Sequence, residues 1–177
     1  MKVDEAVSEI GIGLISGLVG TKVMEPVSMM LYEWEPEAVR RREDAVRPGP
    51  PYEIAAKKTA ELLGLHLTDE QVKRFGMAFH YGLGMSWGPV YLLLRRKARL
   101  SPATAGLLTG AVMSLLVDEG MTPALGFSAP NRAYPLLTHL RGFAAHLAYG
   151  LGVAATAETL SGLMRRRLTE YRRGCIP

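Results

Sequence analysis

Four long stretches of this chain carry almost no charged side chains, and this segregation limits the folds that it can adopt. Residues 75–94, 100–117 and 142–157 contain no Asp, Glu, Lys or Arg, and residues 10–32 contain only two such side chains. A helix that crosses a bilayer needs about 20 mostly apolar residues. A helix at the surface of a soluble bundle would repeat polar residues with a period of 3.6, and these stretches have no such face. The sequence therefore predicts an all-α, four-helix transmembrane bundle.

The 177 residues form a single predicted membrane domain. We place its spans at about 10–32, 75–94, 103–126 and 142–164. The connection between the first two spans is long and polar, and it contains a Pro-Gly-Pro-Pro cluster at 48–51 that breaks any helix.

This connection, residues 33–74, is expected to be partly helical. A short amphipathic helix is predicted over about 52–63. Thr68 and Gln71 then match the capping-box pattern, so the second long helix should begin there and continue unbroken into its span. The connection 127–141 contains Pro130 and Pro135 and is predicted to be a surface loop.

Basic residues beside the spans predict the orientation. A cluster at 95–99 and the arginine-rich segment after 164 lie directly against span ends. Short flanks rich in Lys and Arg stay in the cytoplasm, so both termini are predicted to be cytoplasmic and the long loop external. An arginine-rich tail beside a span meets anionic lipid, so the expected partner is the lipid bilayer and not nucleic acid.

An internal repeat relates the two halves of the chain. Residues 13–17 read Gly-Leu-Ile-Ser-Gly and residues 106–110 read Gly-Leu-Leu-Thr-Gly, an offset of 93. The same offset relates Glu25 to Asp118. The second and fourth spans each carry a histidine shortly before a Tyr-Gly-Leu-Gly motif. The pattern predicts two parallel-related helical hairpins.

Small residues four apart let helices approach closely in lipid. The expected packing residues are Gly13, Gly17, Gly106 and Gly110. We expect the first and third spans to touch along this seam.

Ionisable residues inside predicted spans are costly and are functional candidates by default. The predicted polar site consists of Glu25, His80, Asp118, Glu119 and His146, with Lys22 and Glu158 as secondary candidates. At 1.5 Å per helical residue, the four helices offer these groups at about the same depth in the outer half of the membrane.

Three interpretations of this cluster are open. Two histidines and two or three carboxylates suit a transition metal such as Zn, Fe or Mn. His80 and His146 could instead hold a haem b. The interpretation we favour is a proton-titrating or structural network, because intramembrane charges commonly pair with one another. No phosphate loop, nucleotide fingerprint, catalytic triad or HExxH motif indicates an enzyme.

Short motifs give the chain a resemblance to a known family. They are residues 17–26 (Gly-Leu-Val-Gly-Thr-Lys-Val-Met-Glu-Pro), residues 80–84 (His-Tyr-Gly-Leu-Gly), Asp118-Glu119 with Pro123, and Arg141-Gly142 followed by His146. This pattern resembles the YagU-like bacterial inner-membrane proteins over nearly the whole chain. The resemblance implies a multi-pass protein of the bacterial cytoplasmic (inner) membrane with four helices. It implies no reaction, only a link to acid tolerance.

The functional expectation is therefore an ion- or proton-linked or metal-binding site in a small membrane protein. One alternative is a non-catalytic structural subunit, either of a larger membrane complex or of a homo-oligomer. Another is a haem or metal redox carrier. The transported species or substrate does not follow from the sequence.

Overall fold

A computed structural model describes residues 3–174, and every regular element in that range is helical. The elements are α1 (Val3–Trp34), α2 (Glu37–Val46), α3 (Pro51–Leu62), α4 (Asp69–Lys97), α5 (Pro102–Met113), the π-helix η1 (Ser114–Met121), α6 (Thr122–Ala124), the 3-10 helix η2 (Asn131–Ala133) and α7 (Leu136–Gly174). The all-α prediction is confirmed for this part of the chain.

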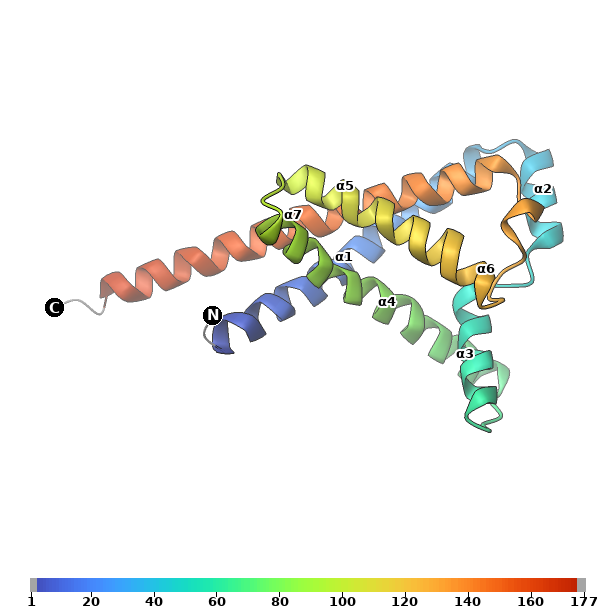
Figure 1. Ribbon diagram of the computed structural model, residues 1–177, viewed down its shortest axis with the longest axis horizontal. Helices are drawn as coiled ribbons and strands as arrows, with labels where there is room; N and C mark the ends of the chain where they lie inside the picture. The colour runs from blue at the N-terminus through green and yellow to red at the C-terminus, as the bar shows by residue number, and fades with distance from the viewer. Residues whose placement is uncertain (1–2, 175–177) are drawn as a thin grey trace.

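The long helices form one elongated bundle (Figure 1). Helix α1 packs against both α4 and α7, and α5 packs against α7. Helices α2, α3 and α6 gather at one end of the bundle, and α3 packs against α4 there. Both chain termini lie at the opposite end.

Local signals set several helix boundaries. The predicted capping box is present, because Gln71 N donates to Thr68 Oγ1 (3.3 Å) and Thr68 N donates to Gln71 Oε1 (2.8 Å). Helix α4 continues without interruption to Lys97, as expected. Helix α3 lies within one residue of its predicted start and end, and Gly64 follows it with φ of +70°.

Two boundaries differ from expectation. Residues 37–46 form helix α2, although the sequence analysis assigned no helix there. The loop predicted over 127–141 is shorter, because α7 already begins at Leu136, directly after Pro135. Proline fits at or just before the first turn of a helix, where its missing N–H costs nothing.

Glycines lie where the helices approach most closely. These approaches join α1 to α4 and α5 to α7, which are not the helices predicted to touch. A Cβ on Gly17 would lie 2.5 Å from Gly84 O of α4, and a Cβ on Gly110 would lie 2.0 Å from His146 O of α7. The expected seam between the first and third spans is therefore wrong. The two halves instead meet where Gly20 of α1 abuts α7, since a Cβ on Gly20 would lie 2.6 Å from Val153 Cγ2.

The bundle exposes many large apolar side chains and buries several hydroxyl groups beside its apolar core. Ser16, Thr21, Thr109 and Ser114 are buried, while large apolar side chains point outward from every long helix. The outward set includes Ile15, Met29, Phe79, Leu93, Leu115, Leu116 and Leu151. The buried hydroxyls of Ser16 and Thr109 each donate to the carbonyl four residues earlier, at 2.7 Å, which satisfies them inside the helix.

By length and composition, one helical segment in the described chain can cross a membrane, the 28 residues Val7–Trp34 of α1. Core helices of soluble proteins and signal sequences share these properties, so this segment alone does not fix a location. Helix α5 has 12 residues before the backbone becomes π-helical, which is short of the roughly 20 that a bilayer requires.

Candidate polar site

Two of the predicted polar residues, Glu25 of α1 and His80 of α4, contact each other. His80 Nε2 lies 3.5 Å from Glu25 Oε1. The same oxygen accepts a 2.8 Å hydrogen bond from the Tyr81 hydroxyl, and Glu25 Oε2 accepts one of 3.1 Å from Lys22 Nζ. The Glu25 carboxylate thus has two hydrogen-bond donors and one histidine around it, and Lys22 supplies the opposite charge.

A second pair forms between Asp118 of η1 and His146 of α7. His146 Nδ1 lies 3.4 Å from Asp118 Oδ2 and 2.9 Å from the Gly142 carbonyl oxygen. The imidazole is buried, whereas 45% of the Asp118 side chain is accessible. This accessible surface faces a cavity, because Asp118 is one of the residues that line it.

The two pairs occupy equivalent places in the sequence repeat. Asp118 follows Glu25 by 93 residues, and His146 follows His80 by 66. The offset of 66 also relates Gly84 to Gly150, each of which is packed against a glycine of the other helix in its hairpin. The Tyr-Gly-Leu-Gly motifs differ by 68, so the helices are matched by their histidines and close-packed glycines rather than by that motif.

Glu119, the fifth predicted residue, belongs to a third pair. Its Oε1 lies 2.7 Å from His139 Nδ1, and His139 Nε2 lies 3.1 Å from the Asn131 carbonyl oxygen. Asn131 Nδ2 also donates to the Glu119 carbonyl oxygen at 2.8 Å. That carbonyl lies four residues before Pro123, which has no N–H to offer it.

The π-helix turns Asp118 and Glu119 toward different partners. Single π-helical turns within α-helices are rare and frequently lie at functional sites. Here the wider turn places adjacent carboxylates beside two histidines of α7. Sequence reasoning missed His139, because it assigned residues 127–141 to a loop. The Pro135 helix-start signal could have found it.

These pairs border one cavity of about 620 Å³ at the α2–α3 end of the bundle. Its ionisable and aromatic lining comprises Arg47, Tyr52, His80, Asp118, Glu119, Tyr134, His139, Arg141 and His146. Tyr52 of α3 stacks near His80 with ring centroids 5.2 Å apart. Burial raises the pKa of the Tyr52 hydroxyl above its ordinary value, so this phenol is neutral at neutral pH.

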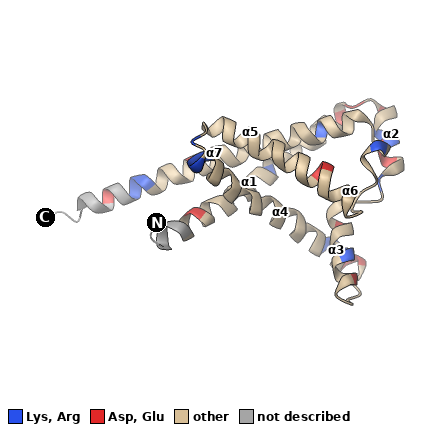
Figure 2. Cartoon of the chain, in the orientation of Figure 1, with Lys and Arg blue, Asp and Glu red and all other residues tan. Residues whose placement is uncertain are grey.

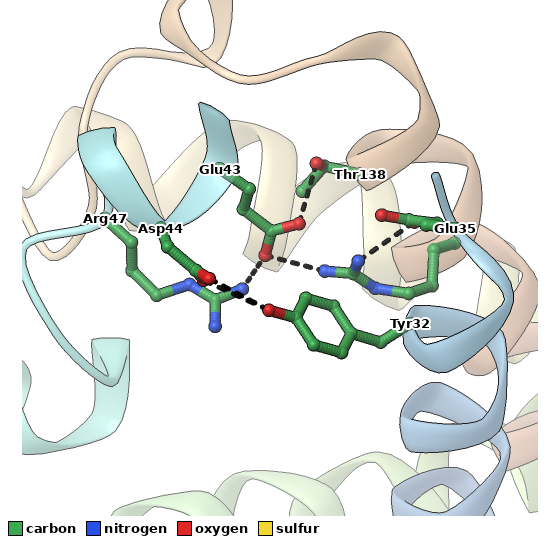
Figure 3. A network of polar contacts seen from close by, with 7 residues as sticks. Tyr32, Glu35, Glu43, Asp44, Arg47 and Thr138 are labelled. Carbon is green, nitrogen blue, oxygen red and sulfur yellow. Dashed lines mark hydrogen bonds and ion pairs between the residues drawn. The ribbon is translucent and has the colours of Figure 1, made fainter. Parts of the chain in front are cut away.

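An ion network borders the cavity. Arg141 of α7 donates to Glu35 Oε1 at 2.9 Å and to Glu43 Oε1 at 2.7 Å. Arg47 also pairs with Glu43, and Thr138 Oγ1 donates to Glu43 Oε2 at 2.9 Å. Figure 3 shows how Glu43 and Glu35 converge from α2 and the end of α1. The network ties helix α2 to both α1 and α7.

Glu158, the other secondary candidate, lies at the opposite end of the bundle. Its Oε1 accepts hydrogen bonds from the Tyr91 hydroxyl at 3.1 Å and from Arg95 Nε at 3.0 Å. It therefore does not belong to the polar site near α2 and α3.

The predicted cluster is thus a set of three His–carboxylate pairs and not one ligand sphere. Among the residues that the structure describes, no group of three or more His, Cys, Asp or Glu side chains is placed to hold a metal ion. Binding of a haem between His80 and His146 stays a prediction. No protein-family model, curated protein or solved structure matches this chain.

Proposed function

We propose that this chain is a multi-pass protein of the bacterial cytoplasmic membrane whose cavity is a proton-linked ion site. In this proposal α1, α4, the segment from α5 to α6, and α7 cross the bilayer as two parallel-related hairpins. The resemblance to YagU-like inner-membrane proteins supports the same location, and its link to acid tolerance fits a protein that handles protons.

The membrane part of the proposal rests on the distribution of side chains. Large apolar residues face outward on all the long helices, and small or hydroxyl-bearing residues such as Ser16, Ala105 and Thr109 are buried between the helices beside apolar core residues such as Val153. Helices that associate in lipid use small residues at their contacts, since apolar surface gains nothing by leaving a lipid environment. A soluble protein would expose such an extensive apolar surface only at a partner interface.

The observation that carries the functional proposal is the pair of equivalent His–carboxylate contacts, 3.5 Å and 3.4 Å, in the two repeats. An imidazole beside a carboxylate is hydrogen-bonded when neutral and ion-paired when protonated, so each pair can hold an exchangeable proton. Histidine is the side chain suited to such exchange near neutral pH. Since His80, Asp118 and His146 line one cavity, protonation of either pair changes the charge that an entering ion meets.

The test is proton or cation flux in vesicles that contain the purified protein and a trapped pH-sensitive dye. Glu25→Gln and Asp118→Asn each remove one carboxylate charge with little change in shape. Both variants are expected to lose pH-dependent flux, because each leaves a histidine without its ion-pair partner. Glu61→Gln, an exposed position on α3, is the matched control and should retain wild-type flux.

Wild-type vesicles without pH-dependent flux, or flux that survives in both variants, would refute the proton-linked site. A structural subunit of a larger membrane complex is the second candidate. It is favoured by the 2.9 Å contact of His146 Nδ1 with the Gly142 carbonyl oxygen, which ties this imidazole to its own helix. For a structural subunit, His146→Ala would lower only thermal stability and complex assembly.

A further inference from the structure

A second cavity, of about 530 Å³, lies at the end of the bundle opposite to the polar site. It is bordered by the N-terminal part of α1, the C-terminal end of α4 with the residues that follow it, and the C-terminal half of α7. Its charged lining consists of Glu9, Arg95, Arg96, Arg99, Glu158 and Arg165. Four guanidinium groups thus face two carboxylates, and Figure 2 shows basic residues gathered where α4 meets α5.

Two of these arginines are fixed in the cavity wall by the two carboxylates. Arg95 Nε pairs with Glu158 Oε1 at 3.0 Å, and its Nη1 donates to the Leu100 carbonyl oxygen at 3.1 Å. Arg96 forms an ion pair with Glu9. Their side chains are 33% and 39% accessible, so both are held in place while part of each surface still reaches the cavity. Fixed guanidinium groups bind an anion with less loss of side-chain entropy than mobile ones.

Arg99 supplies a positive charge that no carboxylate in the described chain neutralises. It is exposed, and it makes no hydrogen bond or ion pair with any side chain that the structure describes. Its φ of +52° lies in the left-handed region, directly after the α4 C-cap residue Ala98. Glycine is the usual residue at that position, because other residues pay a conformational cost there. The backbone conformation of Arg99 therefore costs stability, and its side chain lines the cavity.

We propose that this second cavity binds a phosphate-bearing anion, most simply the headgroup of an acidic phospholipid. The two carboxylates of the cavity pair with Arg95 and Arg96, so Arg99 adds positive charge beyond these pairs, and guanidinium groups match phosphate oxygens in a bidentate way. Basic pockets between membrane helices on the cytoplasmic side bind anionic headgroups in this manner. The lipid as source rests on the proposed membrane location, whereas the phosphate chemistry does not.

The test is a binding titration of the full chain in a neutral detergent. Three probes are compared: a short-chain phosphatidylglycerol, phosphatidylcholine with the same acyl chains, and inorganic phosphate. The phosphatidylglycerol should bind more tightly than the phosphatidylcholine. Arg99→Gln should weaken its binding by about tenfold, the loss of one charge-assisted hydrogen bond. Arg74→Gln removes an exposed arginine near the start of α4, whereas Arg99 follows the other end of that helix. This variant should leave binding unchanged.

Arg99→Gly separates the side chain from its backbone. It should bind the phosphatidylglycerol as weakly as Arg99→Gln does, while thermal unfolding shows that the protein is at least as stable as the wild type. If inorganic phosphate binds as tightly as the lipid and with the same sensitivity to Arg99, the phosphate site is upheld with a soluble source. Equal binding of both lipids, or tight phosphatidylglycerol binding that ignores Arg99, would overturn it. Glu25→Gln should retain this binding, so a failed flux experiment leaves the inference standing.

Discussion

The absence of a Cβ at a few glycines lets the helix backbones of this bundle approach closely. A Cβ on Gly88 would lie 1.8 Å from the Gly13 carbonyl oxygen, whereas one on Gly82 would meet nothing within 4 Å. Both glycines belong to helix α4, so the cost of ordering a glycine in a helix is the same for both. What differs is the neighbouring backbone, which cannot move aside like the end of a flexible side chain.

Gly88→Ala should therefore destabilise the protein by about 1 to 3 kcal/mol, the usual cost of an added group in a packed interior. Gly82→Ala should leave stability unchanged or raise it by up to ~1 kcal/mol, since alanine favours the helix. Thermal unfolding of both variants in one detergent measures the difference. Equal midpoints for the two variants would contradict the close approach of α1 and α4.

Arg141 shows how a buried charged side chain can contribute to the stability of the fold. Its side chain is 9% accessible, and it pairs with two carboxylates that are 8% and 0% accessible. Arg141→Gln should cost about 3 to 5 kcal/mol, because breaking a buried ion pair leaves charge without compensation. The control is Arg41→Gln, whose pair with Glu37 is exposed and so contributes little. If Arg141→Gln and the control unfold at the same temperature, the network of Arg141 with Glu35 and Glu43 does not stabilise the protein.

At the scale of helices, the π-helical segment is the element that most directly shapes the polar site. It lies between α5 and α6, and its Glu119 carbonyl accepts a 2.8 Å hydrogen bond from the Asn131 side chain. The donor comes from a different part of the chain, so the turn is held by the η2 loop as well as by its own backbone.

Asn131→Leu removes that donor while keeping a similar volume. We expect faster hydrogen exchange across residues 114–124 and a loss of about 1 kcal/mol in the free energy of unfolding, the usual contribution of one hydrogen bond. Ser128→Ala changes a hydroxyl in the same connection that bonds only its neighbour Ala129. It should leave exchange in the π-helical segment as in the wild type, and equal exchange in both variants would show that Asn131 does not hold the turn.

The elements that sequence predicted well are those with local signals. The capping box at Thr68 gave the start of α4, and Gly64 marked the end of α3. The π-helix and the Arg141 network could not be predicted in this way. Arg141 meets carboxylates 98 and 106 residues away, and no periodicity within one helix reports such a contact.

At the scale of the whole molecule, the two ends of the bundle have different chemistry. Paired histidines and carboxylates surround the cavity beside α2 and α3, and arginines surround the cavity beside the chain termini. An apolar exterior separates the two ends. A bilayer around this exterior would keep the cavities in separate compartments, which is what a proton-linked site and a cytoplasmic headgroup site require.

This arrangement predicts a topology that single cysteines can test. After Cys175→Ser removes the one native cysteine, Glu61→Cys marks α3 and Ala103→Cys marks the start of α5, both at exposed positions. In intact cells stripped of their outer membrane, a membrane-impermeant maleimide should label position 61 and not position 103. Both should react once the cytoplasmic membrane is opened. If only α1 crossed the membrane, the two positions would lie on the same side and react alike, and the four-span proposal would fail.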